Sequence, residues 1–222
     1  MTTQAEQRDE GRHGGHGGGH GGHGGHEASG AGRGMFDPAN LERLLGEQRR
    51  AALPPEQTLH TAGVTTDQTV VDLGCGPGYF TLPAAEIVGP RGKVYAVDVQ
   101  PEMLAACRAR AAEAGVQGIE FVQSDGIHVP LPDGVADQVL ISVVLHESKD
   151  RAAFVREARR LLKPGGEVAL IEFRKQDGPP GPPKEVRLSE EEVAAVAGAA
   201  GLRVREQRAL NDLHLLYHLA AT

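Results

Sequence analysis

In residues 70–78, Val70-Val71-Asp72-Leu73-Gly74-Cys75-Gly76-Pro77-Gly78, an apolar run passes into a cluster of glycines. An apolar, β-branched run of this length predicts a buried strand. Three glycines in the next five positions predict a loop whose backbone lies close to a ligand, because glycine has no Cβ and readily adopts positive φ. The stretch therefore predicts a binding site at the end of a strand.

Strand-like and helical patterns alternate along the chain around this junction. Strands are expected at residues 69–73, 93–99, 119–123, 139–145 and 167–173, and a closing antiparallel hairpin at 202–205 and 214–220. Helices are expected at 80–88, 101–114, 154–162 and 189–200, the last beginning with a Ser-Glu-Glu-Glu capping box. This alternation predicts an α/β fold with a doubly wound, mostly parallel sheet, whose ligands bind at the carboxyl ends of the strands.

The chain divides by composition into three parts. Residues 1–34 are expected to be a disordered arm, because they are rich in glycine and offer little to bury. Residues 35–66 are expected to form a helical cap, and residues 67–222 the main domain. Histidines recur in the arm at a spacing that suits Ni²⁺, Zn²⁺ or Cu²⁺, with a solvated tail as the alternative: His13, His16, His20, His23 and His26.

Composition excludes several classes of protein. A net charge of −7 and only 5 Phe and 3 Tyr, with no Trp, argue against a nucleic-acid partner. Two cysteines cannot make a disulfide framework, and no apolar run is long enough for a membrane span. The polar N-terminus lacks the apolar segment of a signal peptide, so a cytoplasmic protein without a membrane span is expected.

Two acids favour an adenosine ligand without phosphates. A dinucleotide loop would have glycine where this chain has Tyr79, which weakens a pyrophosphate site. Asp98 ends the second expected strand, 20 residues after Gly78, where a carboxylate can accept both ribose hydroxyls. Asp125 follows the third expected strand, where it can accept a proton from an exocyclic amine.

Together these motifs resemble the class I S-adenosylmethionine-dependent methyltransferases, in particular the small-molecule branch that includes the ubiquinone/menaquinone-biosynthesis C-methyltransferases. The likeness runs from about Val64 to the C-terminus. It rests on the glycine stretch and on four further segments: Val97-Asp98-Val99, Pro101-Glu102-Met103, Ser124-Asp125-Gly126 and Arg160-Leu161-Leu162-Lys163-Pro164-Gly165-Gly166.

The resemblance implies a seven-stranded sheet with a reversed last strand and S-adenosylmethionine as co-substrate. It implies that Asp98 binds the ribose hydroxyls, Val99 packs on the adenine and Asp125 meets the adenine amine. The full set of residues expected at the cofactor is Asp72, Gly74, Cys75, Gly76, Gly78, Asp98, Val99, Ser124, Asp125 and Gly126.

The fourth expected strand ends at Leu145-His146-Glu147-Ser148, and the family places this turn beside the transferred methyl group. His146 is the candidate catalytic residue, because an imidazole can take a proton near neutral pH. His146 could instead position the acceptor, and the alternative to both roles is a hydrogen-bonded pocket histidine that transfers no proton.

Methylation of a small molecule is the leading hypothesis for function. Methylation of RNA or protein is the first alternative, but its best basic face is interpreted as ordinary solvated surface: Arg156, Arg159, Arg160 and Lys163. A metal-handling protein that only senses S-adenosylmethionine is the second alternative. The sequence identifies neither the acceptor nor the oligomeric state.

Overall fold

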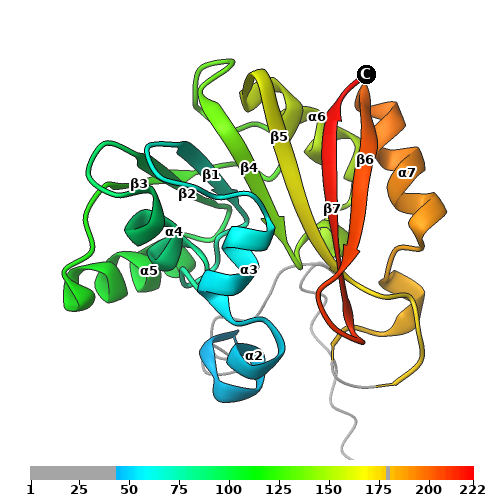
Figure 1. Cartoon of the computed structure of the whole chain (residues 1–222), viewed down its shortest axis with the longest axis horizontal. Helices are drawn as coiled ribbons and strands as arrows, with labels where there is room; N and C mark the ends of the chain where they lie inside the picture. The colour runs from blue at the N-terminus through cyan, green and yellow to red at the C-terminus, as the bar shows by residue number, and fades with distance from the viewer. Residues whose placement is uncertain (1–43, 179–180) are drawn as a thin grey trace, which may run out of the picture. The chain divides into compact units, whose positions relative to one another are not determined.

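The computed structural model describes residues 44–178 and 181–222, and its centre is a twisted sheet (Figure 1). In this part of the chain the sheet has seven strands in the order β3-β2-β1-β4-β5-β7-β6. The strands are β1 (Thr69–Leu73), β2 (Lys93–Asp98), β3 (Ile119–Gln123), β4 (Ala136–Ser142), β5 (Leu162–Phe173), β6 (Leu202–Ala209) and β7 (His214–Ala221). Strands β1 to β5 pair in parallel, whereas β7 is antiparallel to both β5 and β6. The predicted doubly wound sheet with a reversed last strand is confirmed.

Helices and short 3-10 turns connect the strands. They are α2 (Glu47–Ala52), α3 (Pro55–Thr61), α4 (Thr81–Val88), α5 (Pro101–Ala114), η2 (Leu145–Glu147), α6 (Arg151–Leu161), η3 (Lys184–Val186) and α7 (Glu190–Ala199). Local signals explain their ends: Pro55 and Pro101 occupy first turns, and Gly115 caps α5 at φ 69°. The predicted capping box is present, with Ser189 and Glu192 each accepting the other's backbone N–H.

Both faces of the sheet are buried. Successive residues of its central strands point to opposite faces and pack into different clusters. Val139 and Ile141 pack into a cluster with side chains of α6 and α7. Leu140, between them, belongs to a cluster with side chains of α3 and α4 on the other face. Figure 1 shows these helices on the two sides of the sheet. Because helices cover both faces of the sheet, a binding site is expected at the ends of the strands.

Three strands differ from their expected ranges by more than one residue. Strand β4 spans Ala136–Ser142 rather than 139–145, because Val143 adopts φ 57° and turns the chain out of the strand. Strand β5 begins at Leu162, which pairs with Ala136 ahead of an irregularity in the register. Strand β6 continues to Ala209 because it pairs with nearly all of β7.

Helices α2 and α3 lie in the region expected to form the cap. Residues 35–43 of that region are outside the described part of the chain. Leu53 and Leu59 are buried in the cluster that covers β1 and β4, so this region packs on the main domain. None of the helices in the described ranges has the length and apolar character needed to cross a membrane.

Candidate functional site

The glycine loop leaves β1 beside the point where the strand order turns back. Strands β2 and β4 lie on either side of β1, so the carboxyl ends of all three meet at one edge. The backbone N–H groups of Gly74 and Cys75 both donate to the carbonyl of Val97, at 2.8 and 2.9 Å. The loop is therefore held across the end of β2, where an open α/β sheet binds its ligands.

Three glycines of this loop have positive φ, and two of them are also crowded. At Gly74, φ is 82° and an added Cβ would lie 2.8 Å from Cγ1 of Val144, in the turn after β4. At Gly78, φ is 83° and an added Cβ would overlap Sγ of Cys107. At Gly76, φ is 53° and an added Cβ would lie 3.9 Å from Cδ1 of Leu44, its nearest neighbour among the described residues. Close packing thus requires glycine at positions 74 and 78, whereas Gly76 is less crowded.

Asp98, at the end of β2, is tied to the same loop. Its Oδ2 accepts the N–H of Gly76 at 2.8 Å, and its Oδ1 accepts the N–H of Gln100 at 2.9 Å. Burial raises the pKa of Asp98, although these two hydrogen bonds oppose the shift. Each carboxylate oxygen has a further lone pair, so Asp98 can still accept two hydroxyl donors.

Asp72, near the end of β1, lies deeper under the loop. It is 3% exposed, and its Oδ2 accepts the Thr81 hydroxyl at 2.6 Å. Burial is the main reason that the pKa of Asp72 rises to about 6, and the nearby Asp98 charge adds to the effect.

Arg49 of α2 is a residue that the sequence reasoning missed. Its guanidinium stacks on the Tyr79 ring, 4.6 Å from the centroid, and it interacts electrostatically with Asp72. Its Nε is buried and has no hydrogen-bond partner among the described residues. Burial lowers the pKa of Arg49. Helix α2 therefore brings a cation with a spare donor to the acid beneath the glycine loop.

The residues after β3 lie next to the end of β2. The N–H of Ser124 donates to the Asp98 carbonyl at 3.0 Å, and a Cβ on Gly126 would lie 3.4 Å from Cγ1 of Val99. The Oδ1 of Asp125 accepts two N–H groups of its own loop, from Ile127 at 2.9 Å and from His128 at 2.7 Å. The structure thus brings together the residues that the sequence predicts for an adenosine.

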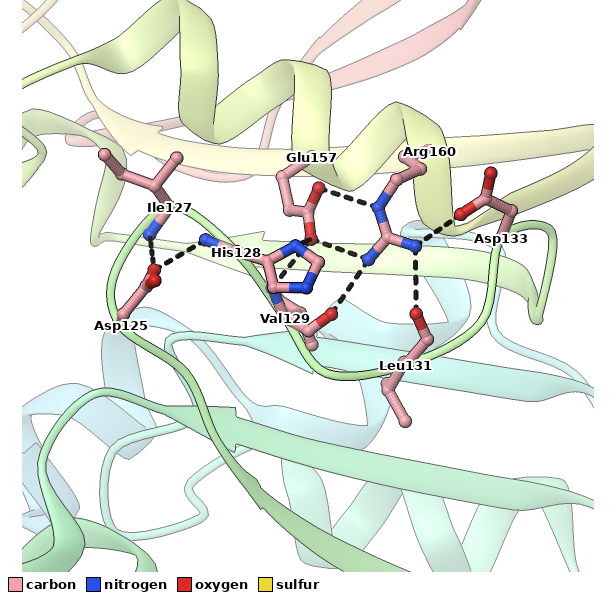
Figure 2. Close-up of polar contacts among 8 residues, drawn as sticks. All are labelled: Asp125, Ile127, His128, Val129, Leu131, Asp133, Glu157 and Arg160. Carbon is pink, nitrogen blue, oxygen red and sulfur yellow. Dashed lines mark hydrogen bonds and ion pairs between the residues drawn. The ribbon is translucent and has the colours of Figure 1, made fainter.

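A guanidinium on α6 organises the loop between β3 and β4 (Figure 2). Arg160 contacts both carboxylate oxygens of Glu157, with Nε at 2.8 Å and Nη2 at 2.6 Å. It also donates to the carbonyls of Val129 and Leu131, both at 2.9 Å, and to Asp133 at 2.6 Å. The interpretation of Arg160 as ordinary solvated surface is wrong, because its donors are used to hold this loop.

Glu157 completes the same network from α6. Its Oε1 accepts the N–H of Val129 at 2.7 Å and lies 3.3 Å from Nδ1 of the exposed His128 (Figure 2). Burial acts to raise the pKa of Glu157, but the hydrogen bonds from Arg160 and Val129, together with the nearby charge of Arg160, outweigh it and lower the pKa. Glu157 is therefore held charged between the helix and the loop that carries Asp125.

His146 lies in η2, directly after β4, and contacts acids on two sides. Its Nδ1 is 2.9 Å from Oε2 of Glu172, at the end of β5, and its Nε2 is 3.9 Å from Oε1 of Glu147. Only 7% of the His146 side chain and 2% of the Glu172 side chain are exposed. Burial acts to lower the pKa of His146, but the Glu172 contact reverses this and raises the pKa. Glu172 was missed because the predicted strand gave no reason to single it out.

Metal binding has no support in the described ranges. In residues 44–178 and 181–222 no group of three or more His, Cys, Asp or Glu side chains could hold a metal ion. The five arm histidines lie outside the described residues. The two cysteines, Cys75 and Cys107, are buried and not joined by a disulfide.

The similarities of this chain to known proteins agree with its fold and its glycine loop. Residues 71–170 match Methyltransf_11, described as a methyltransferase domain. A solved S-adenosylmethionine-dependent methyltransferase from Aquifex aeolicus is 31% identical, with a TM-score of 0.79 over 83% of this chain and 98% of that one. The chain belongs to the class I S-adenosylmethionine-dependent methyltransferases.

More particular likenesses lie within that class. The ubiquinone/menaquinone biosynthesis C-methyltransferase UbiE of Ectopseudomonas mendocina is 37% identical over 123 residues, 55% of this chain and 48% of that protein. The demethylmenaquinone methyltransferase of Lactococcus lactis is 36% identical over 116 residues, covering 52% and 46%. The chain thus spans about half the length of these curated relatives.

A further solved structure shares the fold alone. NcsB1, an O-methyltransferase from neocarzinostatin biosynthesis, was solved with S-adenosyl-L-homocysteine and 1,4-dihydroxy-2-naphthoic acid. It is 22% identical, with a TM-score of 0.67 over 84% of this chain and 59% of that one.

Proposed function

We propose that this protein transfers a methyl group from S-adenosylmethionine to a small-molecule acceptor by in-line displacement. The observation that carries the proposal is the junction of Asp98 with the glycine loop, at the edge where the carboxyl ends of β1, β2 and β4 meet. The sulfonium is already an activated methyl donor. The protein therefore has mainly to align donor and acceptor and to exclude water.

The nucleoside of the donor would lie along the ends of β2 and β3. Asp98 accepts the two ribose hydroxyls through its remaining lone pairs, and Val99 with Gly126 forms the wall against the adenine. Asp125 receives the adenine amine, and its own-loop hydrogen bonds fix its carboxylate. Ser124 joins this wall to the end of β2.

The methionine end of the donor would lie over the glycine loop, between Asp72 and Arg49. This end carries an ammonium and a carboxylate, so it complements an acid and a guanidinium placed side by side. The buried Nε of Arg49, which has no partner in the part of the chain that the structure describes, supports this assignment, because a buried donor without a partner is costly unless a ligand satisfies it. Gly74, Cys75, Gly76 and Gly78 would line the path between the two ends of the donor.

A small-molecule acceptor fits this chain better than a macromolecule. Arg160, the residue at the centre of the basic face, is committed to the loop before β4 and is not available to a phosphate backbone. The net charge of −7 also disfavours nucleic acid. The named relatives act in quinone biosynthesis, and NcsB1 was solved with a naphthoic acid. On the acceptor side, His146 either removes a proton or positions the acceptor.

Calorimetry with the full chain tests the donor site. S-adenosylmethionine and S-adenosylhomocysteine should bind, and NAD should not. Asp98→Ala should weaken S-adenosylhomocysteine binding by roughly 10- to 100-fold, because a charge-assisted hydrogen bond is worth on the order of 1.5 to 3 kcal/mol. Arg49→Met should weaken binding as well, whereas the matched change Arg50→Met on the exposed neighbour should not.

The proposed reaction is tested by the release of S-adenosylhomocysteine with three kinds of acceptor. A panel of small aromatic acids and phenols, bulk tRNA, and a cell protein extract are each incubated with the enzyme and methyl donor. Turnover confined to small molecules is the expected result. Turnover with tRNA that falls steeply with salt would instead establish the RNA alternative, and binding of the donor without any turnover would favour a sensor.

A further inference from the structure

Glu172 is a buried acid with no role in the donor site. It lies at the end of β5, is 1% exposed, and directs both carboxylate oxygens at His146. Oε1 accepts the His146 backbone N–H at 3.2 Å, and Oε2 lies 2.9 Å from the ring Nδ1. Oε1 is also 3.2 Å from Nδ1, so one carboxylate holds both the backbone and the ring of His146.

These contacts decide which ring nitrogen is free. An ionised carboxylate can only accept hydrogen bonds, so the short contact to Glu172 places the proton of a neutral ring on Nδ1. Nε2 then carries the lone pair. It points away from Glu172, toward the side where Glu147 lies.

Nε2 of His146 lies at the same edge of the sheet as the proposed donor site. Val144, two residues before His146, fills the space beside Gly74 in the glycine loop, at 2.8 Å from where a Cβ would be. Glu147, one residue after it, interacts electrostatically with Asp98. Val143 holds φ 57° at this turn, a strained conformation for a β-branched residue and one that is typical of functional sites.

We propose that Glu172 is a positioning residue that holds His146 as a base with Nε2 facing the acceptor, and that the site accordingly takes acceptors that lose a proton on methylation. The inference rests on the proposed methyltransferase function and narrows it. Hydroxyl, N–H and acidic C–H acceptors belong to this class. Tertiary amines and thioethers do not, because they become cations without releasing a proton.

This arrangement accounts for each bond and for the proton in the methyl transfer. The acceptor atom forms a bond to the methyl carbon while the methyl–sulfur bond breaks and its electron pair passes to sulfur. The acceptor proton goes to Nε2 of His146, and the resulting imidazolium pairs with Glu172. Glu147, whose Oε1 is 3.9 Å from Nε2, then receives the proton and passes it to water through its partly exposed side chain.

Three charged groups and burial set the pKa of the His146 ring. Burial alone lowers the pKa of His146; Glu172 on β5 and Glu147 on η2 raise it, and Arg151 on α6 lowers it, with a net rise. Burial raises the pKa of Glu147, which makes its carboxylate a better proton acceptor. Removing the charge of Glu172 should therefore lower the pKa of His146 and weaken it as a base.

Nitrogen NMR of the full chain, labelled in histidine and bound to S-adenosylhomocysteine, tests the geometry without any acceptor. The His146 signal is assigned by its loss in His146→Gln. The neutral ring should carry its proton on Nδ1, and Glu172→Gln should lower the titration midpoint by about one pH unit. Glu167→Gln, on the same strand but paired with Arg205, is the matched control and should change neither. A proton on Nε2, or an unchanged midpoint in Glu172→Gln, would overturn the proposal.

Rates test the acceptor class, with 1,4-dihydroxy-2-naphthoic acid as the acceptor that has protons to lose and N,N-dimethylaniline as the one that has none. Only the naphthoic acid should be methylated. Glu172→Gln should lower kcat by roughly 10-fold or more at pH 8 and move the acidic limb to lower pH, with donor affinity unchanged. Transfer to dimethylaniline, or donor binding without transfer to the naphthoic acid, contradicts the acceptor class. A failure to bind the donor at all would contradict the proposed function and leave the NMR result standing.

Discussion

Gly78 keeps the glycine loop in place because it has no side chain. Its φ is 83°, and an added Cβ would fall on Cys107 of α5 and within 2.9 Å of Leu82 of α4. Gly115 has a similar φ, 69°, but nothing within 4 Å. Substitutions at these two glycines therefore distinguish the free-energy cost of a positive φ from the cost of a steric clash.

We expect Gly115→Ala to lower the free energy of unfolding by about 1 kcal/mol, the cost of positive φ in a residue with a Cβ. Gly78→Ala should lower it by a further 1 to 3 kcal/mol or so, because Cys107 has to move in a well-packed core. Urea denaturation of both variants gives the comparison. Equal losses would mean that the loop relaxes freely around position 78.

Asp72 makes the stability of the fold depend on pH. Its pKa is raised from 3.8 to about 6 in the folded chain, so folding favours the protonated form. The stabilisation from that proton is complete below pH 4 and is lost as the pH rises through 6, an effect on the order of 3 kcal/mol. The Asn side chain of Asp72→Asn cannot titrate. In urea denaturation this variant should therefore lose less stability than the wild type as the pH rises from 4 to 7. A parallel course of the two curves, like that expected for the exposed Asp212→Asn, would contradict this assignment.

Among the elements, α6 has two tasks. One face buries Phe154, Val155, Ala158 and Leu161 against the sheet. Its edge presents Glu157 and Arg160 to the loop that carries Asp125. The helix therefore links the core of the sheet to one wall of the proposed adenine pocket.

Arg160→Met should loosen this wall, because it keeps the aliphatic stem and removes every contact to the loop carbonyls. We expect faster hydrogen exchange at the amides of Ile127 and His128 and a several-fold weaker affinity for S-adenosylhomocysteine. Arg156→Met, on the same helix with one long contact to the Ala199 carbonyl at 3.5 Å, is the control and should change neither. The link to Asp125 is checked in the Asp125→Ala background, where Arg160→Met should cost little further affinity.

The elements differ in how well their sequences predict them. Helix α5 could be placed to the residue, because Pro101 and Gly115 mark its two ends. The end of β4 could not, because residues 143–145 are as apolar as the strand, and only the tertiary structure turns Val143 to positive φ. The glycine loop and Asp98 could be predicted from local spacing. Arg49 and Glu172 could not, since each is brought to the site by packing between distant segments.

Across residues 44–178 and 181–222, buried apolar residues extend from Leu53 to Leu219. Both faces of the sheet are covered by helices of these ranges. Residues 1–34 are rich in glycine and offer few apolar side chains to bury. The proposed donor site uses residues between Arg49 and Gly126 together with the turn after β4.

Deletion of residues 1–34 should therefore leave the unfolding midpoint and the affinity for S-adenosylhomocysteine unchanged. The same deletion should abolish most binding of Ni²⁺, because it removes all five arm histidines, and imidazoles three or four residues apart can converge on one ion. Calorimetry with Ni²⁺ on the full chain and the truncated chain measures this, and a full-length variant with the five histidines changed to Gln separates metal ligation from loss of the segment. That variant should match the truncation. Undiminished Ni²⁺ binding in either protein would place the metal site elsewhere, and an unfolded truncated chain would show that the segment stabilises the domain.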